Sequence, residues 1–320
     1  MHSPSIHNTH RRLPLLLASL LCHLLSMAQS DFRTPWISCP DLAAGEQAWF
    51  REVVELDERP AEARLTLITT GYGELFVNGW NVTTAVRQPY REDDDRGAAL
   101  GITYDITRYL GAGSNVVAIH YSPAEWTEKP ADRQVAAHLW GCYSNGSPFA
   151  LDSDDDWLCR PAAKRLLKSG DERIDGRVKE IRDEVPTYGI ACWKPVMSSP
   201  AAFDADDYDE PEDHSPADYV THIVIPDYLI PTHEGMSCVF SMGFNGWLRV
   251  TLRKAKAGMK IRIDDTEYIC SGAFDEQVCP FVAVRPHRIV HIVGDANFKA
   301  EMVHSVEGLI IGPRDVSPFE

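Results

Sequence analysis

The stretch GYGELFVNGWN, Gly71–Asn81, decides the fold class predicted for this chain. Its first half contains the strand formers Leu75–Val77, and the dipeptide Asn78-Gly79 follows them directly. Asparagine and glycine both tolerate the positive φ angles that a two-residue hairpin turn requires. The stretch therefore predicts two antiparallel strands that are joined by a tight turn.

The stretch YDITRYLGAGSNVVAIHY, Tyr104–Tyr121, extends this pattern. Asp105 or Thr107 is expected to cap a single helical turn, and Val116–Tyr121 then predicts a buried strand. Strand-like runs dominate elsewhere, and Arg160–Lys168 is the segment expected to form a short helix. The length allows two domains, so the predicted fold class is all-β, with two β-sandwich domains of the jelly-roll, galactose-binding-like type.

The order of these segments resembles the N-terminal β-sandwich of bacterial α-L-rhamnosidases, family 78 of the glycoside hydrolases. The resemblance begins at TPWISCP around Trp36 and continues through WFREVVEL, Trp49–Leu56, and Ala63–Gly79. It returns at FALDSDDDW, Phe149–Trp157. A later block, Val239–Ile269, resembles the second sandwich, which in that family precedes a helical barrel. The resemblance implies that the catalytic carboxylates of the family lie on that barrel.

The N-terminus predicts export. A basic pair precedes the apolar run Leu13–Leu25, and the small residues Ser26 and Ala28 suit a signal peptidase. The run is well under the ~20 residues that a spanning helix needs, so residues 1–28 are predicted to be a signal peptide and no membrane span is expected. The expected location is the periplasm, the cell surface or the medium of a bacterium.

Composition predicts the domain borders. Asp204–Asp218, DADDYDEPEDHSPAD, carries eight acidic residues and neither Lys nor Arg, which disfavours a packed core. The first sandwich is predicted at 29–200, an acidic linker or loop at 201–218, and the second sandwich at 219–320. Closely spaced carboxylates also suit Ca²⁺, so calcium is the one cofactor left open, and no other is expected.

Charge and cysteine usage narrow the class of partner. The chain has 31 basic and 47 acidic residues and a net charge of −16, which disfavours nucleic acid and anionic membranes as partners. Of the eight cysteines, Cys270 and Cys279 are close enough in sequence to face each other across a loop. No zinc-site spacing occurs, and scattered buried thiols are the preferred interpretation.

Sugar recognition needs an aromatic platform and nearby polar groups, and the loops of the first sandwich supply both. No G-x-S-x-G or phosphate-loop motif is present, so no catalytic residue and no metal ligand is assigned. The candidate carbohydrate-binding residues are Trp126, Trp80, Tyr90, Asn78, Arg91 and Glu125.

Three functions remain open at this point. The leading hypothesis is an exported, non-catalytic carbohydrate-binding or accessory protein in glycan breakdown, whose partner is a glycan, with rhamnose-containing glycans implied by the resemblance. The first alternative is a truncated or split α-L-rhamnosidase whose catalytic barrel is a separate subunit. The second is a structural sandwich scaffold without a ligand. The chain alone is not expected to be an enzyme.

Overall fold

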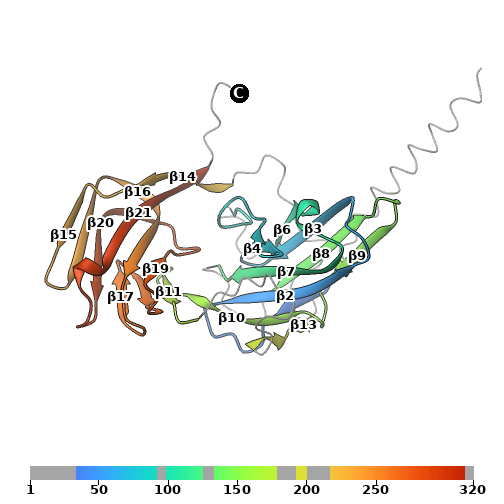
Figure 1. Ribbon diagram of the computed structural model, residues 1–320, viewed down its shortest axis with the longest axis horizontal. Helices are drawn as coiled ribbons and strands as arrows, with labels where there is room; N and C mark the ends of the chain where they lie inside the picture. Colours follow the sequence, from blue (N-terminus) through green and yellow to red (C-terminus); the bar gives the residue numbers. More distant parts are fainter. Residues whose placement is uncertain (1–33, 92–98, 125–132, 179–191, 200–216, 314–320) are drawn as a thin grey trace, which may run out of the picture.

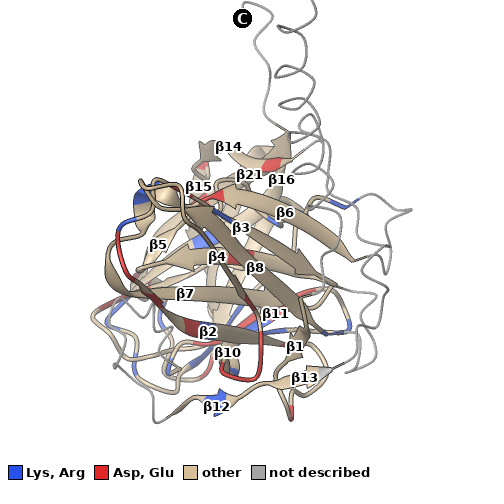
Figure 2. Cartoon of the chain, turned by 90° about the vertical axis from the view of Figure 1, so that its right-hand side faces the viewer, with Lys and Arg blue, Asp and Glu red and all other residues tan. Residues whose placement is uncertain are grey.

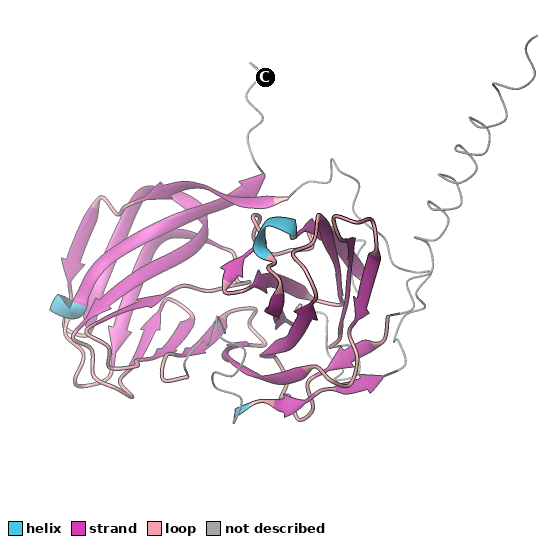
Figure 3. Cartoon of the chain, turned by 45° about the vertical axis from the view of Figure 1, so that its right-hand side comes forward, coloured by secondary structure: helices cyan, strands magenta, loops and turns pink. Residues whose placement is uncertain are grey.

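The computed structural model describes residues 34–91, 99–124, 133–178, 192–199 and 217–313 (Figure 1). β-strands dominate these segments, and the helical elements among them are short 3₁₀ turns such as Thr107–Tyr109 and Ala300–Met302 (Figure 3). The predicted all-β class with sandwich domains is confirmed. The predicted signal peptide lies outside the described residues. Within them, no helix has the length and apolarity needed to cross a bilayer.

The first sandwich consists of two facing layers of strands. One layer has the order β13 (Met197–Ser199), β1 (Trp36–Ser38), β8 (Val135–Cys142), β3 (Glu62–Thr69), β6 (Leu100–Asp105), with β9 (Pro148–Asp152) beside β8. The other has the order β10 (Leu158–Leu166), β2 (Glu46–Leu56), β7 (Gly113–Ser122), β4 (Tyr72–Val77), β5 (Trp80–Asn81), with β12 (Lys194–Pro195) beside β10. Alternating apolar side chains from both layers, among them Phe50, Leu65 and Ile119, fill the core.

The hairpin predicted at Asn78-Gly79 is confirmed. Both turn residues have positive φ, 50° and 80°, and Val77 pairs with Trp80 across the turn. The predicted helical turn is the 3₁₀ turn Thr107–Tyr109, which follows β6. The predicted cap is wrong, because Ile106 occupies the N-cap position and no described side chain caps the turn; Asp105, one residue earlier, accepts a 3.0 Å hydrogen bond from the Thr107 N–H.

The helix predicted over Arg160–Lys168 is wrong. Residues 160–166 of this segment belong to strand β10, which pairs with β2 on one side and with β11 (Glu172–Asp175) on the other. Cys159, Ala163 and Leu166 are its buried apolar residues, and the register shifts between Pro161 and Arg165. Pairing with neighbours that are distant in sequence outweighed the local preference for helix.

The second sandwich has the strand order β14 (Asp218–Val224), β21 (Val303–Pro313), β16 (Gly235–Arg253), β20 (Arg285–Gly294), β17 (Lys260–Ile263), β18 (Thr266–Ile269), with β15 (Tyr228–Pro231) and β19 (Asp275–Val278) beside β16. The alternation expected along Trp247–Arg253 is confirmed, because Leu248, Val250 and Leu252 are buried between half-buried polar residues. These side chains belong to the apolar core of the second sandwich, whose strands lie at the left in Figure 1.

Strand β11 joins the two sandwiches. It runs antiparallel to β10 of the first and parallel to β18 of the second, with Ile174 opposite Tyr268 (Figure 1). A single hydrogen-bonded sheet therefore continues through both cores. The acidic segment Asp204–Asp218 lies outside the described residues except for Ala217 and Asp218. The Arg87 guanidinium lies 3.4 Å from the Asp218 carboxylate, which ties the start of the second sandwich to the first.

Candidate functional site

Two of the predicted sugar-binding residues lie at the β4–β5 hairpin. Trp80 is 68% exposed there. The Asn78 side chain donates hydrogen bonds to the Tyr109 carbonyl (2.8 Å) and to Asn115 Oδ1 (2.9 Å), and it accepts one from the Val116 N–H (2.8 Å). The Asn78 amide thus stabilises the hairpin, while the Trp80 side chain is exposed to solvent.

Tyr90 and Arg91 lie at the opposite end of β4. The Arg91 guanidinium donates to the carbonyls of Thr69 (2.8 Å) and Gly71 (3.1 Å), at the point where β3 ends and β4 begins. Both residues are half-buried. Glu125 and Trp126 lie outside the described residues, but β7 ends at Ser122, which is paired with Tyr72 at this same end of β4.

The structure thus separates the four described candidates into two groups at opposite ends of one strand. Trp80 and Asn78 form one group, and Tyr90 and Arg91 form the other. A single sugar ring does not reach both ends of a six-residue strand, since each residue advances the chain by about 3.3 Å. The Tyr90 end is the one at which β7 ends. Acidic and basic residues are interspersed over the strands and loops of this sandwich (Figure 2).

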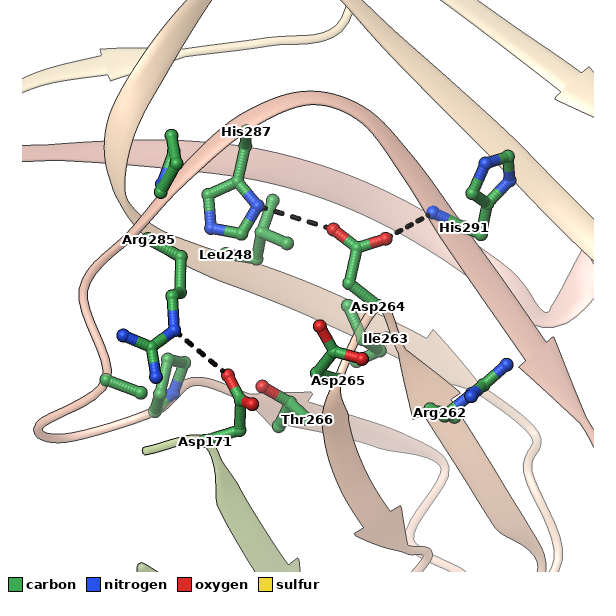
Figure 4. A pocket seen from close by; sticks show the side chains of 13 residues that line it. Asp171, Leu248, Arg262, Ile263, Asp264, Asp265, Thr266, Arg285, His287 and His291 are labelled. Atoms are coloured by element: carbon green, nitrogen blue, oxygen red, sulfur yellow. Dashed lines mark hydrogen bonds and ion pairs between the residues drawn. The ribbon is translucent and has the colours of Figure 1, made fainter. Parts of the chain in front are cut away.

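A pocket of about 400 Å³ lies in the second sandwich, against the link between β10 and β11. The turn between β17 and β18, the first half of β20 and Asp171 of the link form its walls (Figure 4). Its charged and titratable lining residues are Asp171, Arg262, Asp264, Asp265, Arg285, His287 and His291.

Asp264 organises one wall of this pocket. Asp264-Asp265 is a two-residue hairpin turn, and Asp264 has a φ of 48°, which aspartate tolerates better than most residues. The Asp264 carboxylate accepts a 2.8 Å hydrogen bond from the His291 N–H and lies 3.3 Å from Nδ1 of His287 (Figure 4). The turn and β20 therefore hold each other in place.

The opposite wall joins the two sandwiches. Nε of Arg285 lies 3.2 Å from Oδ1 of Asp171, and Nη2 of the same guanidinium donates to the Ser169 carbonyl at 2.9 Å (Figure 4). The Asp171 side chain is largely buried, whereas Arg285 is about one-third exposed. This ion pair orients a guanidinium at the pocket while it fixes the link against the second sandwich.

The two histidines both belong to β20, where the His287 side chain is largely buried and His291 is exposed. The His287 ring lies 5.1 Å from the Phe244 ring, and Nδ1 of His291 lies 3.0 Å from the Ser237 hydroxyl. Carboxylates accept hydrogen bonds and guanidinium groups donate them. The lining can therefore bind hydroxyl groups, which both donate and accept hydrogen bonds. Within the described segments, no group of three or more His, Cys, Asp or Glu side chains is placed to hold a metal ion.

This pocket was not predicted from the sequence. Two local signals were present: the Asp264-Asp265 turn in KIRIDDTEYI, and the spacing of His287 and His291 in PHRIVHI. Each signal alone is common in surface strands and turns. Asp171 completes the wall through its contact with Arg285, 114 residues away in sequence, and no sequence pattern indicated that contact.

Two β-sandwiches that share a continuous sheet, with a polar pocket beside their junction, define the class of this protein as an all-β multi-sandwich protein. Residues 58–207 match the family described as alpha-L-rhamnosidase N-terminal domain. The resemblance that the sequence motifs predicted, to the N-terminal region of α-L-rhamnosidases, is thereby confirmed.

Curated relatives agree with this match. An α-L-rhamnosidase of Formosa agariphila is 25% identical over 199 aligned positions, and the comparison covers 53% of this chain and 21% of that protein. A second α-L-rhamnosidase of the same organism is 27% identical over 124 residues, 34% of this chain and 13% of that protein. The chain thus spans about a fifth or less of the length of these relatives.

Solved structures share the fold. The α-L-rhamnosidase of Dictyoglomus thermophilum has a TM-score of 0.74 at 18% identity, and that of Aspergillus terreus has 0.75 at 17%. Each comparison covers 88% of this chain and 36% of the other. The Streptomyces avermitilis enzyme, solved in complex with L-rhamnose, has a TM-score of 0.70 at 19% identity and covers 85% of this chain and 29% of its own.

Proposed function

We propose that this chain is an exported, non-catalytic carbohydrate-binding or accessory protein that acts in glycan breakdown and binds a rhamnose-containing glycan. The observation that carries the proposal is the match of residues 58–207 to the alpha-L-rhamnosidase N-terminal domain. The relatives that the chain matches are glycosidases named for L-rhamnose linkages, so a glycan with this sugar is the first ligand to test.

The pocket beside the junction supports the proposal chemically. Its volume, about 400 Å³, lies within the range of small-molecule sites. Asp265 and Arg262 are exposed at its edge, so a carboxylate and a guanidinium are available to hydroxyl groups there. The Tyr90 end of the first sandwich is the second place where a sugar is expected, with Trp126 as the stacking residue.

Isothermal titration calorimetry with L-rhamnose and a rhamnose-containing oligosaccharide tests the proposal, with galactose as the comparison sugar. We expect binding of the rhamnose ligands and at least a tenfold weaker affinity for Asp265→Ala if the pocket is the site. Asp57→Ala is the matched control, because Asp57 is an exposed carboxylate on the first sandwich, away from the pocket. Absence of binding to every rhamnose ligand would favour the scaffold alternative.

A second candidate function is that of a partner of a separate catalytic subunit. The solved relatives that share this fold are α-L-rhamnosidases, so this activity is assayed on the chain directly. The purified chain is expected not to hydrolyse aryl α-L-rhamnosides. Turnover that survives purification and disappears when one acidic residue is replaced would show that the chain is itself a glycosidase.

A further inference from the structure

Two cysteines from opposite layers of the first sandwich lie at one of its corners. Cys39 directly follows β1, and Cys159 is the second residue of β10. The short segment that contains β12 and β13 crosses this corner, since Lys194 pairs with Cys159 and Met197 pairs with Ser38. Ser38, next to Cys39, therefore lies opposite Met197, and Cys159 lies opposite Lys194, three positions earlier on the same crossing segment.

Both side chains point into the core between the layers. Cys39 is 7% exposed and Cys159 is fully buried, and both belong to the same apolar core. Each of the two side chains has the largest effect on the pKa of the other, so the thiols interact. Sγ of Cys159 also lies 3.7 Å from the Pro195 carbonyl on the crossing segment. The thiols thus meet across the sandwich, although 119 residues separate them in sequence.

The contact makes the two thiols unequal. The interaction between them, together with burial, raises the pKa of the Cys39 thiol, and the same interaction lowers the pKa of Cys159. Lys194, which is paired with Cys159, also favours the Cys159 thiolate. The buried thiols Cys238 and Cys270 of the second sandwich show the opposite behaviour, because burial raises the pKa of each to about 12. A thiolate is the form that attacks a disulfide.

We propose that Cys39 and Cys159 form a disulfide that joins the two layers of the first sandwich when the chain folds in an oxidising compartment. The oxidant is a small disulfide such as glutathione disulfide. The Cys159 thiolate attacks one glutathione sulfur and releases the first glutathione thiolate. The Cys39 thiolate then attacks Sγ of Cys159, forms the protein disulfide and releases the second. The two protons of the cysteines end on the two glutathione thiols, so the glutathione disulfide is reduced and the cysteine pair is oxidised.

A cross-link at this corner acts mainly on the unfolded chain. The disulfide closes a long loop, and a long loop restricts the unfolded ensemble more than a short one does. It also fixes β1, the strand that connects β13 to β8, against β10 of the other layer. The proposal is independent of glycan binding, because none of the pocket residues lies at this corner.

Peptide mapping of the full chain tests the proposal directly. The reduced, unfolded protein is refolded in a buffer of reduced and oxidised glutathione, free thiols are alkylated, and the protein is digested with trypsin and a protease that cleaves at aspartate. Trypsin alone leaves Cys142 and Cys159 in one peptide, because no Lys or Arg lies between them. Cleavage at Asp152 by the second protease separates them. We expect a cross-linked pair of peptides with Cys39 and Cys159, the loss of two free thiols per chain, and loss of the pair after reduction.

Cys39→Ser and Cys159→Ser are expected to lose the cross-linked pair. Dithiothreitol is expected to lower the melting temperature of the wild type and to leave that of these two variants unchanged. Cys142→Ser is the matched control, because Cys142 shares the tryptic peptide but is half-buried on β8, and it should retain the cross-linked pair and the effect of dithiothreitol. Alkylated Cys39 and Cys159 in the refolded wild type, or a link from either to another cysteine, would overturn the proposal. The map of the wild type decides the question even where a variant fails to fold.

Discussion

The backbone N–H of Phe281 donates a 2.6 Å hydrogen bond to Oε2 of Glu172, across the junction of the two sandwiches. The N–H of Val282 adds a second bond to the same oxygen at 3.1 Å, and Nε2 of Gln47 donates to Oε1 at 2.7 Å. Glu172 and Gln47 are completely buried. One carboxylate from β11 therefore accepts hydrogen bonds from both halves of the molecule, and its removal should destabilise both.

Glu172→Gln is expected to lower the free energy of unfolding by about 2–3 kcal/mol, because a neutral amide replaces a carboxylate that accepts from buried donors. Urea unfolding, followed by tryptophan fluorescence, measures the effect. Glu267→Gln is the control, since Glu267 pairs with Arg173 on the surface and should change stability by less than about 1 kcal/mol. Equal losses for the two variants would mean that the junction does not depend on Glu172.

Asn78 combines a special backbone conformation with three side-chain hydrogen bonds, and two substitutions separate these contributions. Asn78→Gly keeps the positive φ and loses the hydrogen bonds, so we expect a loss of about 2 kcal/mol. Asn78→Ala loses the bonds and also strains the backbone, which should cost about 1 kcal/mol more. Thermal melts rank the two variants, and an Ala variant as stable as the Gly variant would contradict the turn assignment.

Glu52 predicts a pH dependence of stability. Burial, followed by repulsion from Asp154, raises the pKa of this carboxyl to about 7. The folded chain therefore keeps a proton that the unfolded chain releases near pH 4.5, and stability falls as the pH rises from about 4.5 to about 7. The penalty is fully present above that window. Because Glu52 is half-buried, we expect Glu52→Gln to gain about 1–2 kcal/mol near pH 8 and little near pH 4.

Urea unfolding of the wild type and of Glu52→Gln at several pH values checks this dependence. Glu58→Gln serves as the control, since Glu58 is an exposed carboxyl just beyond the same strand. A stability difference between wild type and Glu52→Gln that does not vary with pH would show that Glu52 titrates in its ordinary range.

Trp126→Ala is predicted to abolish glycan binding with little loss of stability, if Trp126 stacks on a sugar at the rim of the first sandwich. Trp157→Ala provides the reference for a buried tryptophan, since Trp157 is 4% exposed in the first core and its truncation should cost about 3–5 kcal/mol. Calorimetric binding and thermal melts distinguish the two behaviours. A fall in melting temperature as large as that of Trp157→Ala would place Trp126 in a core and remove it from the site.

Local rules accounted for those parts of the fold that depend on near neighbours in sequence. The turn at Asn78-Gly79 follows from the φ angles that these two residues accept, and the alternation along Trp247–Arg253 follows from the two faces of a strand. The resemblance in the motifs around Gly71–Asn81 and Tyr104–Tyr121 predicted the family match of residues 58–207. The sequence by itself therefore determined the all-β class and the resemblance to rhamnosidase N-terminal domains.

Tertiary structure decided the features that join residues far apart in the chain. Arg160–Lys168 had a composition compatible with helix, and its pairing with β2 and β11 made most of it strand. The pocket exists because Asp171 of the first half meets Arg285 of the second, and the thiols of Cys39 and Cys159 meet because β12 and β13 cross one corner. The physical reason is common to all three: the free energy of such contacts depends on burial and on register between strands, and neither is a property of a short stretch of sequence.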